Sequence, residues 1–152
     1  MKDVKDVAAY ILSKLGYVST MKLQKLVYYS QVCFLVRHNK PLFSNKIEAW
    51  VNGPVVRDLY NYHKGQFVVS LDEMSFKGST NDLNSDEKEC VDFVIEHFGE
   101  KSGNELSEMT HCESPWIDAR EGAENGERSD NVISIDSILE YYSNKDNCIF
   151  AA

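Results

Sequence analysis

The segment from Thr20 to His38 constrains the fold of this chain more than any other. Its apolar side chains recur at helical spacing on more than one side, so little of the circumference of the helix would be polar. A helix that is apolar nearly all round is a buried one. Lys22, Lys25, Ser30 and Gln31 interrupt the segment, whereas a bilayer span needs about 20 mostly apolar residues. We therefore expect the central helix of a soluble domain, with other elements packed around it.

Shorter amphipathic segments on both sides of this helix are expected to pack against it. Each follows a side chain that can cap a helix, or a serine followed by proline. The expected capping residues are Asp3, Ser19 or Thr20, Asn84, Ser102, Ser114 and Ser134. Gly16 and Gly122 are expected to end the helices before them. In the last helix, the residues at inward-facing spacing are Ile135, Ile138, Leu139 and Tyr142.

A short β element is expected between the central helix and residue 72. Ile47 to Val51 alternates as a strand does, and Asn52-Gly53-Pro54 has the composition of a tight turn in which Gly53 serves only the turn. Residues 55–64 continue at helical spacing, and Gln66 to Leu71 could pair with the first strand. Residues 72–84 have a loop composition. The chain of 152 residues is thus expected to form one mainly α (α+β) domain over 1–152, with five to seven helices and a small β element.

The charge of the chain is unevenly distributed. Residues 1–80 hold eleven Lys/Arg against six Asp/Glu, whereas residues 81–130 hold four against fifteen, within a net charge of −8. An acidic stretch of this kind disfavours nucleic acid and can attract a basic protein. The four cysteines match no metal or disulfide pattern, and the N-terminus has no apolar signal core. We expect reduced thiols, a cytoplasmic location and no membrane association.

No complete catalytic motif or phosphate-binding loop is present. The densest polar cluster is Thr110-His111-Cys112-Glu113-Ser114-Pro115-Trp116, with Arg120 one helical turn later. His111 and Glu113 could share a metal or act as acid and base, but two ligands without a third are weak evidence for zinc. The favoured interpretation is structural: both residues would satisfy backbone groups between two helices, and Trp116 would anchor the core. We expect no catalytic residue, metal or cofactor.

Aromatic and basic side chains outside this cluster allow two interpretations. Lys25, Tyr28 and Tyr29 could suggest catalysis, but tyrosines at helical spacing are more often core residues with a polar tip. Trp50 alternates out of phase with its apolar neighbours and could be a core residue or an exposed binding anchor.

Three stretches together resemble a known family. They are K-L-Q-K-L-V-Y-Y-S-Q at 22–31, P-L-F-S-N-K-I-E-A-W-V-N-G-P-V-V at 41–56, and L-S-E-M-T-H-C-E-S-P-W-I-D-A-R at 106–120. In order and spacing, over about residues 4–143, they resemble the Panacea domain of SocA-like antitoxins and GepA-like phage-associated proteins. The positions that match are Leu23, Lys25, Leu26, Tyr28, Tyr29, Glu48, Trp50, Gly53, Pro54, Thr110, His111, Glu113, Pro115, Trp116 and Arg120.

The resemblance implies a protein of a bacterium or its phage that neutralises a toxin through contact, without catalysis. Family members neutralise toxins of unrelated kinds, and at least one presents its toxin to a protease. The alternatives are a phage-encoded inhibitor or protease adaptor that acts on a host protein, and an enzyme using His111 and Glu113. The candidate partner-binding residues are Trp50, Gly53, Pro54 and Tyr60. The sequence does not specify the partner or the oligomeric state.

Overall fold

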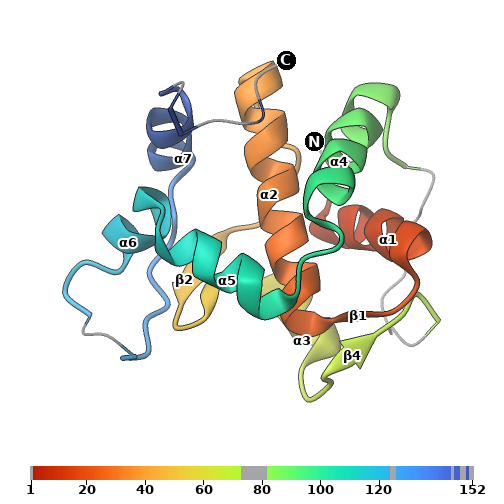
Figure 1. Cartoon of the computed structure of the whole chain (residues 1–152), viewed down its shortest axis with the longest axis horizontal. Helices are drawn as coiled ribbons and strands as arrows, with labels where there is room; N and C mark the ends of the chain where they lie inside the picture. The colour runs from red at the N-terminus through yellow and green to blue at the C-terminus, as the bar shows by residue number, and fades with distance from the viewer. Residues whose placement is uncertain (1, 73–81, 124–125, 145, 148–149, 151–152) are drawn as a thin grey trace.

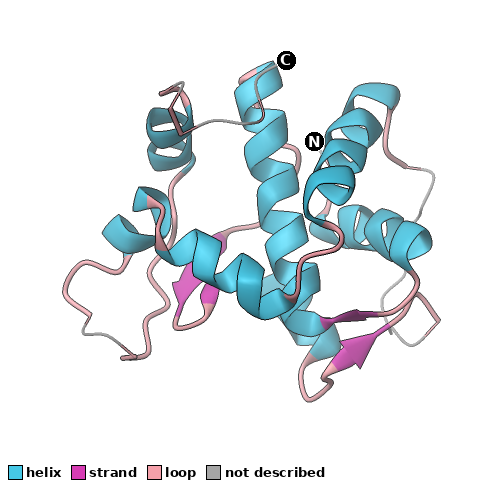
Figure 2. Cartoon of the chain, in the orientation of Figure 1, coloured by secondary structure: helices cyan, strands magenta, loops and turns pink. Residues whose placement is uncertain are grey.

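The computed structural model of this protein describes residues 2–72, 82–123, 126–144, 146–147 and 150. Seven helices and two small two-stranded sheets form this part of the chain, which confirms the mainly α fold with a small β element (Figure 2). The helices are α1 (Val4–Leu15), α2 (Thr20–His38), α3 (Arg57–His63), α4 (Ser85–Phe98), α5 (Gly103–His111), α6 (Ser114–Ala119) and α7 (Ile135–Tyr142). The strands are β1 (Val18–Ser19), β2 (Ile47–Trp50), β3 (Gly53–Val56) and β4 (Val68–Val69). The loop expected over 72–84 falls mostly outside the described residues.

Helix α2 lies at the centre of the molecule, as predicted (Figure 1). Helices α1, α4, α5 and α7 all contact it, and every residue from Leu23 to Leu35 is buried. The buried polar side chains of this helix bind backbone groups: Gln31 accepts from the amide of Leu42 and donates to the carbonyl of Phe43. These bonds satisfy polar groups that would otherwise be costly to bury. None of the described helices is both long and apolar enough to cross a membrane.

Local capping chemistry determines where most helices begin. Five helices start with a side-chain oxygen that accepts a backbone N–H, and these oxygens belong to Asp3, Ser19, Asn84, Ser102 and Ser134. Asn84 and Ser102 form complete capping boxes, in which a glutamate three residues later accepts from the backbone of the cap. These five starting points were predicted from the sequence, because a cap depends only on residues within one turn.

The β element differs from the prediction. Residues 53–56 form strand β3, which pairs with β2 as an antiparallel hairpin around the two-residue turn Val51-Asn52, and α3 begins only at Arg57. The helical spacing across Val55 and Val56 was misleading, because their β-branched side chains also suit a strand. The side chain of Gln24 fixes the end of the hairpin: it accepts from the amide of Val56 at 2.9 Å and donates to the carbonyl of the same residue.

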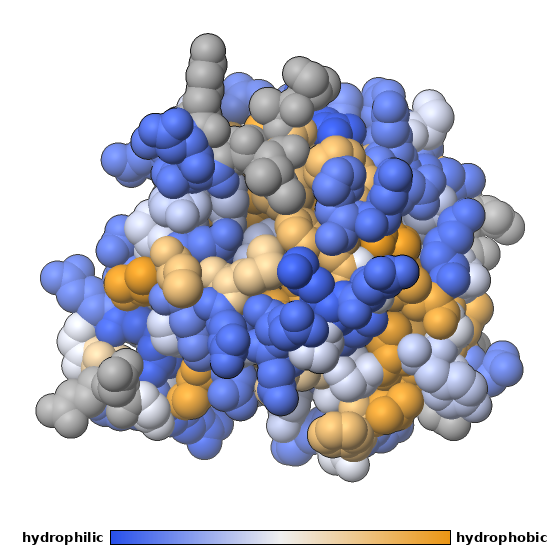
Figure 3. All heavy atoms as spheres, viewed as in Figure 1, coloured by the Kyte–Doolittle hydropathy of each residue, from blue (hydrophilic) through white to orange (hydrophobic). Residues whose placement is uncertain are grey.

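The second sheet was also assigned to the wrong partner. Strand β4 pairs with β1 and not with β2, in the register Val18 to Val69 and Ser19 to Val68. The sheet leaves apolar side chains on the surface, with Phe67 82% and Tyr17 68% exposed. The space-filling view shows apolar atoms gathered over β4, at the lower right (Figure 3).

Two details of the C-terminal helices correct the sequence analysis. Helix α6 is capped at Glu113 and begins at Ser114, one residue earlier than predicted, and the Glu113 side chain makes no capping bond because it binds another helix. In α7, Ile138 and Tyr142 are buried as expected, but Ile135 is 39% exposed. Ile135 occupies the first position of its helix, where the apolar face has not yet turned onto the core.

Candidate functional site

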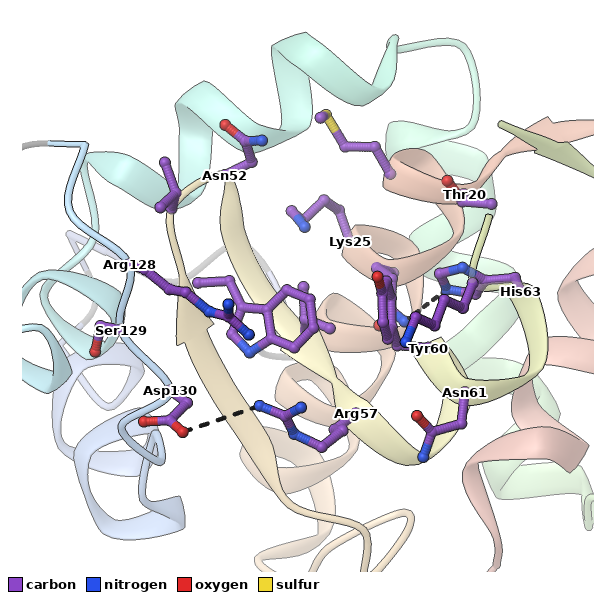
Figure 4. Close-up of a pocket in the computed structure, with 16 residues that line it drawn as sticks. Thr20, Lys25, Asn52, Arg57, Tyr60, Asn61, His63, Arg128, Ser129 and Asp130 are labelled. Carbon is purple, nitrogen blue, oxygen red and sulfur yellow. Dashed lines mark hydrogen bonds and ion pairs between the residues drawn. The ribbon is translucent and has the colours of Figure 1, made fainter. Parts of the chain in front are cut away.

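A pocket of about 680 Å³ lies beside the first half of α2. Its walls come from α2, the β2–β3 hairpin, α3 and residues 128–130, which lie on the opposite side from α2 (Figure 4). The pocket therefore joins segments that are far apart in the sequence. Among its lining residues are the expected anchors Trp50 and Tyr60 and the buried Lys25.

Lys25 is the most unusual side chain of this pocket. It extends from α2 into the pocket, yet only 1% of its surface is exposed (Figure 4). Its Nζ donates a hydrogen bond of 3.0 Å to the carbonyl oxygen of Pro54. Within the part of the chain that the structure describes, no carboxylate forms an ion pair with it. Because burial disfavours the charged form, the pKa of Lys25 falls from its ordinary 10.5 to about 7.

Gly53 allows the hairpin to pack closely against Lys25. A Cβ atom at this position would lie 2.6 Å from Cε of Lys25 and 2.8 Å from Oγ1 of Thr110. The φ angle of Gly53 is also +116°, in a region that side chains rarely adopt. The expectation that this glycine serves only the turn is therefore wrong: it also allows the close approach of the hairpin to α2 and α5.

The outer wall of the pocket is an aromatic and ionic cluster. Arg57 binds Glu48 in bidentate fashion, with Nη2 to Oε1 at 2.8 Å and Nε to Oε2 at 3.0 Å, and its guanidinium lies 5.1 Å from the centre of the Trp50 ring. Trp50 donates from Nε1 to Glu48, and its ring meets that of Tyr60 edge to face at 4.9 Å. Burial alone would raise the pKa of Glu48, but the bonds from Arg57 and Trp50 lower it. Trp50 is half-buried, so it is neither a core residue nor a fully exposed one.

His63 closes the pocket behind Tyr60 and is neutral. Its Nε2 lies 2.9 Å from Nε2 of Gln24, whose own Oε1 accepts from the amide of Val56. Gln24 must then donate, so the ring nitrogen of His63 accepts and carries no proton. Burial lowers the pKa of His63, and the nearby Lys25 lowers it further.

The cluster around Trp116 binds the backbone of strand β2. Trp116 donates from Nε1 to the carbonyl of Trp50 at 2.8 Å, and Arg120 donates to the carbonyl of Ala49 at 3.0 Å. The Arg120 guanidinium also lies 5.0 Å from the Trp116 ring centre, and His111 stacks on that ring at 4.0 Å. The carbonyls of Ala49 and Trp50 are therefore bound from the α6 corner, while the Trp50 side chain lines the pocket.

Glu113 makes its contacts inside the core. It accepts a hydrogen bond of 2.8 Å from the hydroxyl of Tyr29 on α2, and not from the backbone groups that we expected. The Tyr142 hydroxyl lies near the same carboxylate, outside ideal hydrogen-bond geometry. Burial raises the pKa of Glu113, whereas the two tyrosine hydroxyls oppose this change. Burial likewise raises the pKa of Tyr28 and of Tyr29.

His111 and Glu113 thus have separate partners. The ring of His111 lies against Trp116, where burial lowers its pKa, and the carboxylate of Glu113 binds Tyr29. In this arrangement His111 and Glu113 do not form the acid–base pair that their spacing in the sequence allowed. Among the described residues, no three His, Cys, Asp or Glu side chains are placed to hold a metal ion.

Several lining residues were not anticipated from the sequence. Arg57, His63, Lys64 and Arg128 line the pocket, although none belongs to the motifs singled out. Arg57 could have been noticed as the partner of Glu48, since a charged residue directly follows the hairpin. Arg128 gives no such signal, because it lies in a polar loop within the acidic stretch.

A comparison with models of known protein families places most of the chain in a family. The family model described as "Antitoxin SocA-like, Panacea domain" matches residues 23–117, which include most of α2, the hairpin, α5 and the start of α6. No curated protein and no solved structure matches the chain.

Proposed function

This chain belongs to the family of SocA-like antitoxins with the Panacea domain, and from that premise we propose that it binds a toxin protein and neutralises it by direct contact. The protein would act without turnover, in the cytoplasm of a bacterium or of a phage-infected bacterial cell. The family assignment suggests the role in a toxin–antitoxin system. The contact mechanism and the contact surface are our proposal.

The observation that carries the proposal is that Trp50 and Tyr60 lie together on one wall of the pocket. Both are half-buried, and their rings are in contact. Large aromatic side chains that are already ordered supply binding energy at low entropic cost. Glu48 and Arg57 hold Trp50 in place before any partner arrives.

The surface next to this pocket extends the proposed contact. Thr20 and Lys64 line the pocket, and the exposed Phe67 follows three residues after Lys64. The carbonyl of Phe67 accepts from the amide of Thr20, which ties β4 to the start of α2. A partner seated on Trp50 and Tyr60 would therefore also cover the apolar area over β4. Gly53 and Pro54 would contribute by placing the hairpin, since both are buried.

The test is co-expression of this protein with the toxin encoded beside it, or captured with it, in a growth-rescue assay. Trp50→Ala and Tyr60→Ala should each weaken both rescue and complex formation. The matched control is Ile135→Ala, which removes an exposed apolar side chain from α7, away from the residues that line the pocket. Circular dichroism should show the same helical signal for all three variants.

The stoichiometry of rescue decides the mechanism. Inhibition by contact predicts that rescue is complete only near one antitoxin per toxin. Rescue at far lower ratios would contradict the proposal and favour a protease adaptor or an enzyme. If Trp50→Ala and Tyr60→Ala both rescue as well as Ile135→Ala, the contact surface has been placed wrongly.

A further inference from the structure

The residues that line the pocket have an excess of positive charge, although the net charge of the chain is −8. Four of its lining residues are Lys or Arg, namely Lys25, Arg57, Lys64 and Arg128, and one is acidic, namely Asp130. Arg57 is already bound to Glu48, with Asp130 4.0 Å away. Within the described part of the chain, the other three cations have no carboxylate partner.

Lys25 makes this excess charge costly for the free protein. An ammonium group offers three hydrogen-bond donors, and here one of them meets the carbonyl of Pro54. The side chain cannot easily withdraw, because Gly53 packs against its Cε atom. A buried cation without a counter-charge is unfavourable, so a negative group that enters the pocket would relieve this cost.

The walls of the pocket favour a single carboxylate over a nucleotide or another large anion. The Trp50 ring already has Arg57 over it and the edge of Tyr60 against it, so these two aromatic side chains do not form an open slot for a base. The net negative charge of the whole protein would also repel a ligand with several charges. An acidic side chain with an apolar neighbour matches the cations and the aromatic wall together.

We propose that the pocket binds an acidic side chain of the partner protein, whose carboxylate contacts the ammonium of Lys25 and the guanidinium of Arg128. This inference rests on the proposed function and specifies the chemistry of its contact. The acidic stretch of this chain would then guide the approach of basic parts of the partner, while the pocket holds one of its acidic residues.

A small-molecule probe tests the pocket directly. N-acetyl-glutamate N-methylamide, titrated into the 15N-labelled protein, should shift the resonances of Lys25, Trp50 and Arg128. It should also raise the pKa of Lys25 by one unit or more, since an adjacent negative charge favours the protonated form. The uncharged glutamine analogue should have neither effect. Equal responses to the two probes, or binding of inorganic phosphate without binding of the glutamate probe, would overturn the proposal.

Substitutions of Lys25 and Arg128 test whether these two side chains bind the probe. Arg128 is exposed, so Arg128→Gln should leave the fold intact and weaken probe binding about tenfold. Lys25→Met should abolish probe binding. Lys40→Gln removes an exposed charge beyond the other end of α2 and should change nothing. Unaltered binding by both pocket variants would refute the assignment.

Neutralisation assays separate the two proposals. Arg128→Glu should weaken toxin binding, and replacing one acidic toxin residue by lysine should restore it, whereas Lys40→Glu should have no effect. If Arg128→Glu neutralises normally while Trp50→Ala does not, the acidic contact is wrong and the proposed function stands. If the wild type binds the glutamate probe but neutralises no toxin, the proposed function is wrong and the anion site stands.

Discussion

The buried lysine predicts how the stability of this protein depends on pH. The unfolded chain binds a proton at Lys25 up to its ordinary pKa of 10.5, whereas the folded protein releases it at a pKa of about 7. Between these values the unfolded state holds more protons, so the free energy of unfolding rises with pH. The stability is fully present above pH 10.5 and is lost as the pH falls to about 7.

The size of this effect follows from the two pKa values. A separation of about 3.5 units corresponds to about 5 kcal/mol over the whole window, at 1.36 kcal/mol per unit. From pH 7 to pH 9, where tyrosines do not yet titrate, the expected gain is about 2 kcal/mol. From pH 5 to pH 6.5 both states are protonated at Lys25, so the gain should be close to zero.

The assay is urea unfolding of the wild type and of Lys25→Met at several pH values. Methionine fills a similar volume and has no charge, so subtracting its curve removes the contributions of titrating groups that Lys25 does not perturb. Burial and, after it, Lys25 lower the pKa of His63 and of His111, but both pKa values lie below the ordinary value and so below the window from pH 7 to pH 9. The difference in unfolding free energy, wild type minus variant, should grow by about 2 kcal/mol between pH 7 and pH 9. Lys40→Met, at an exposed site, should run parallel to the wild type. If Lys25→Met also ran parallel, the fold would not disfavour the charged form of Lys25. A carboxylate that enters the pocket would then relieve no energetic cost, and this part of the argument for an anion site would fail.

Three further predictions concern stability and association. Leu26→Ala should lower the unfolding free energy by about 2–5 kcal/mol, because Leu26 is fully buried in α2. Urea unfolding measures this loss, and a loss below about 1 kcal/mol would contradict the prediction. Gly53→Ala should cost about 2–4 kcal/mol through its positive φ and the contact with Lys25, whereas Gly65→Ala, which has a positive φ but open space, is the control and should cost less. Association with a basic toxin, measured by stopped-flow, should slow as salt rises from 50 to 500 mM, and a salt-independent rate would exclude steering by the acidic stretch.

The sequence predicts elements whose causes are local. Helix α2 was identified because its apolar residues recur within one continuous segment, and the caps were identified because a capping bond spans three residues. Strand β3 of the hairpin was missed because the apolar spacing around residues 53–56 fits both a helix and a strand. Its pairing is fixed by Gln24, which lies about 30 residues earlier and binds the backbone of Val56. The β1–β4 sheet was missed because strands of two residues carry no detectable alternation.

The candidate site was predicted only for residues with a recognisable sequence pattern. Trp50 and Tyr60 were expected as anchors, and both line the pocket. Lys25 was noticed, but the sequence alone does not reveal that it lacks a carboxylate partner among the described residues, because this depends on what surrounds it in the fold. Arg128 could not be predicted, because its position follows from how the polar loop after α6 returns to the hairpin.

The positions that carry the family resemblance lie where the three stretches meet. Gly53 packs on Lys25 and Thr110, and Tyr29 binds Glu113. These contacts join α2, the hairpin and the α5–α6 corner into one scaffold. Four residues at the rim of the pocket are outside the motifs, namely Arg57, Tyr60, Lys64 and Arg128, whereas Glu48 and Trp50 of the outer wall belong to the second stretch. A scaffold made of the motif positions, with a rim outside them, is what a binding module needs if its relatives are to neutralise unrelated toxins. Because the rim sets the charge and shape presented to the partner, exchanging these four residues between two family members should exchange their toxin preference while both folds persist. Unchanged preference after such an exchange would place recognition elsewhere on the surface.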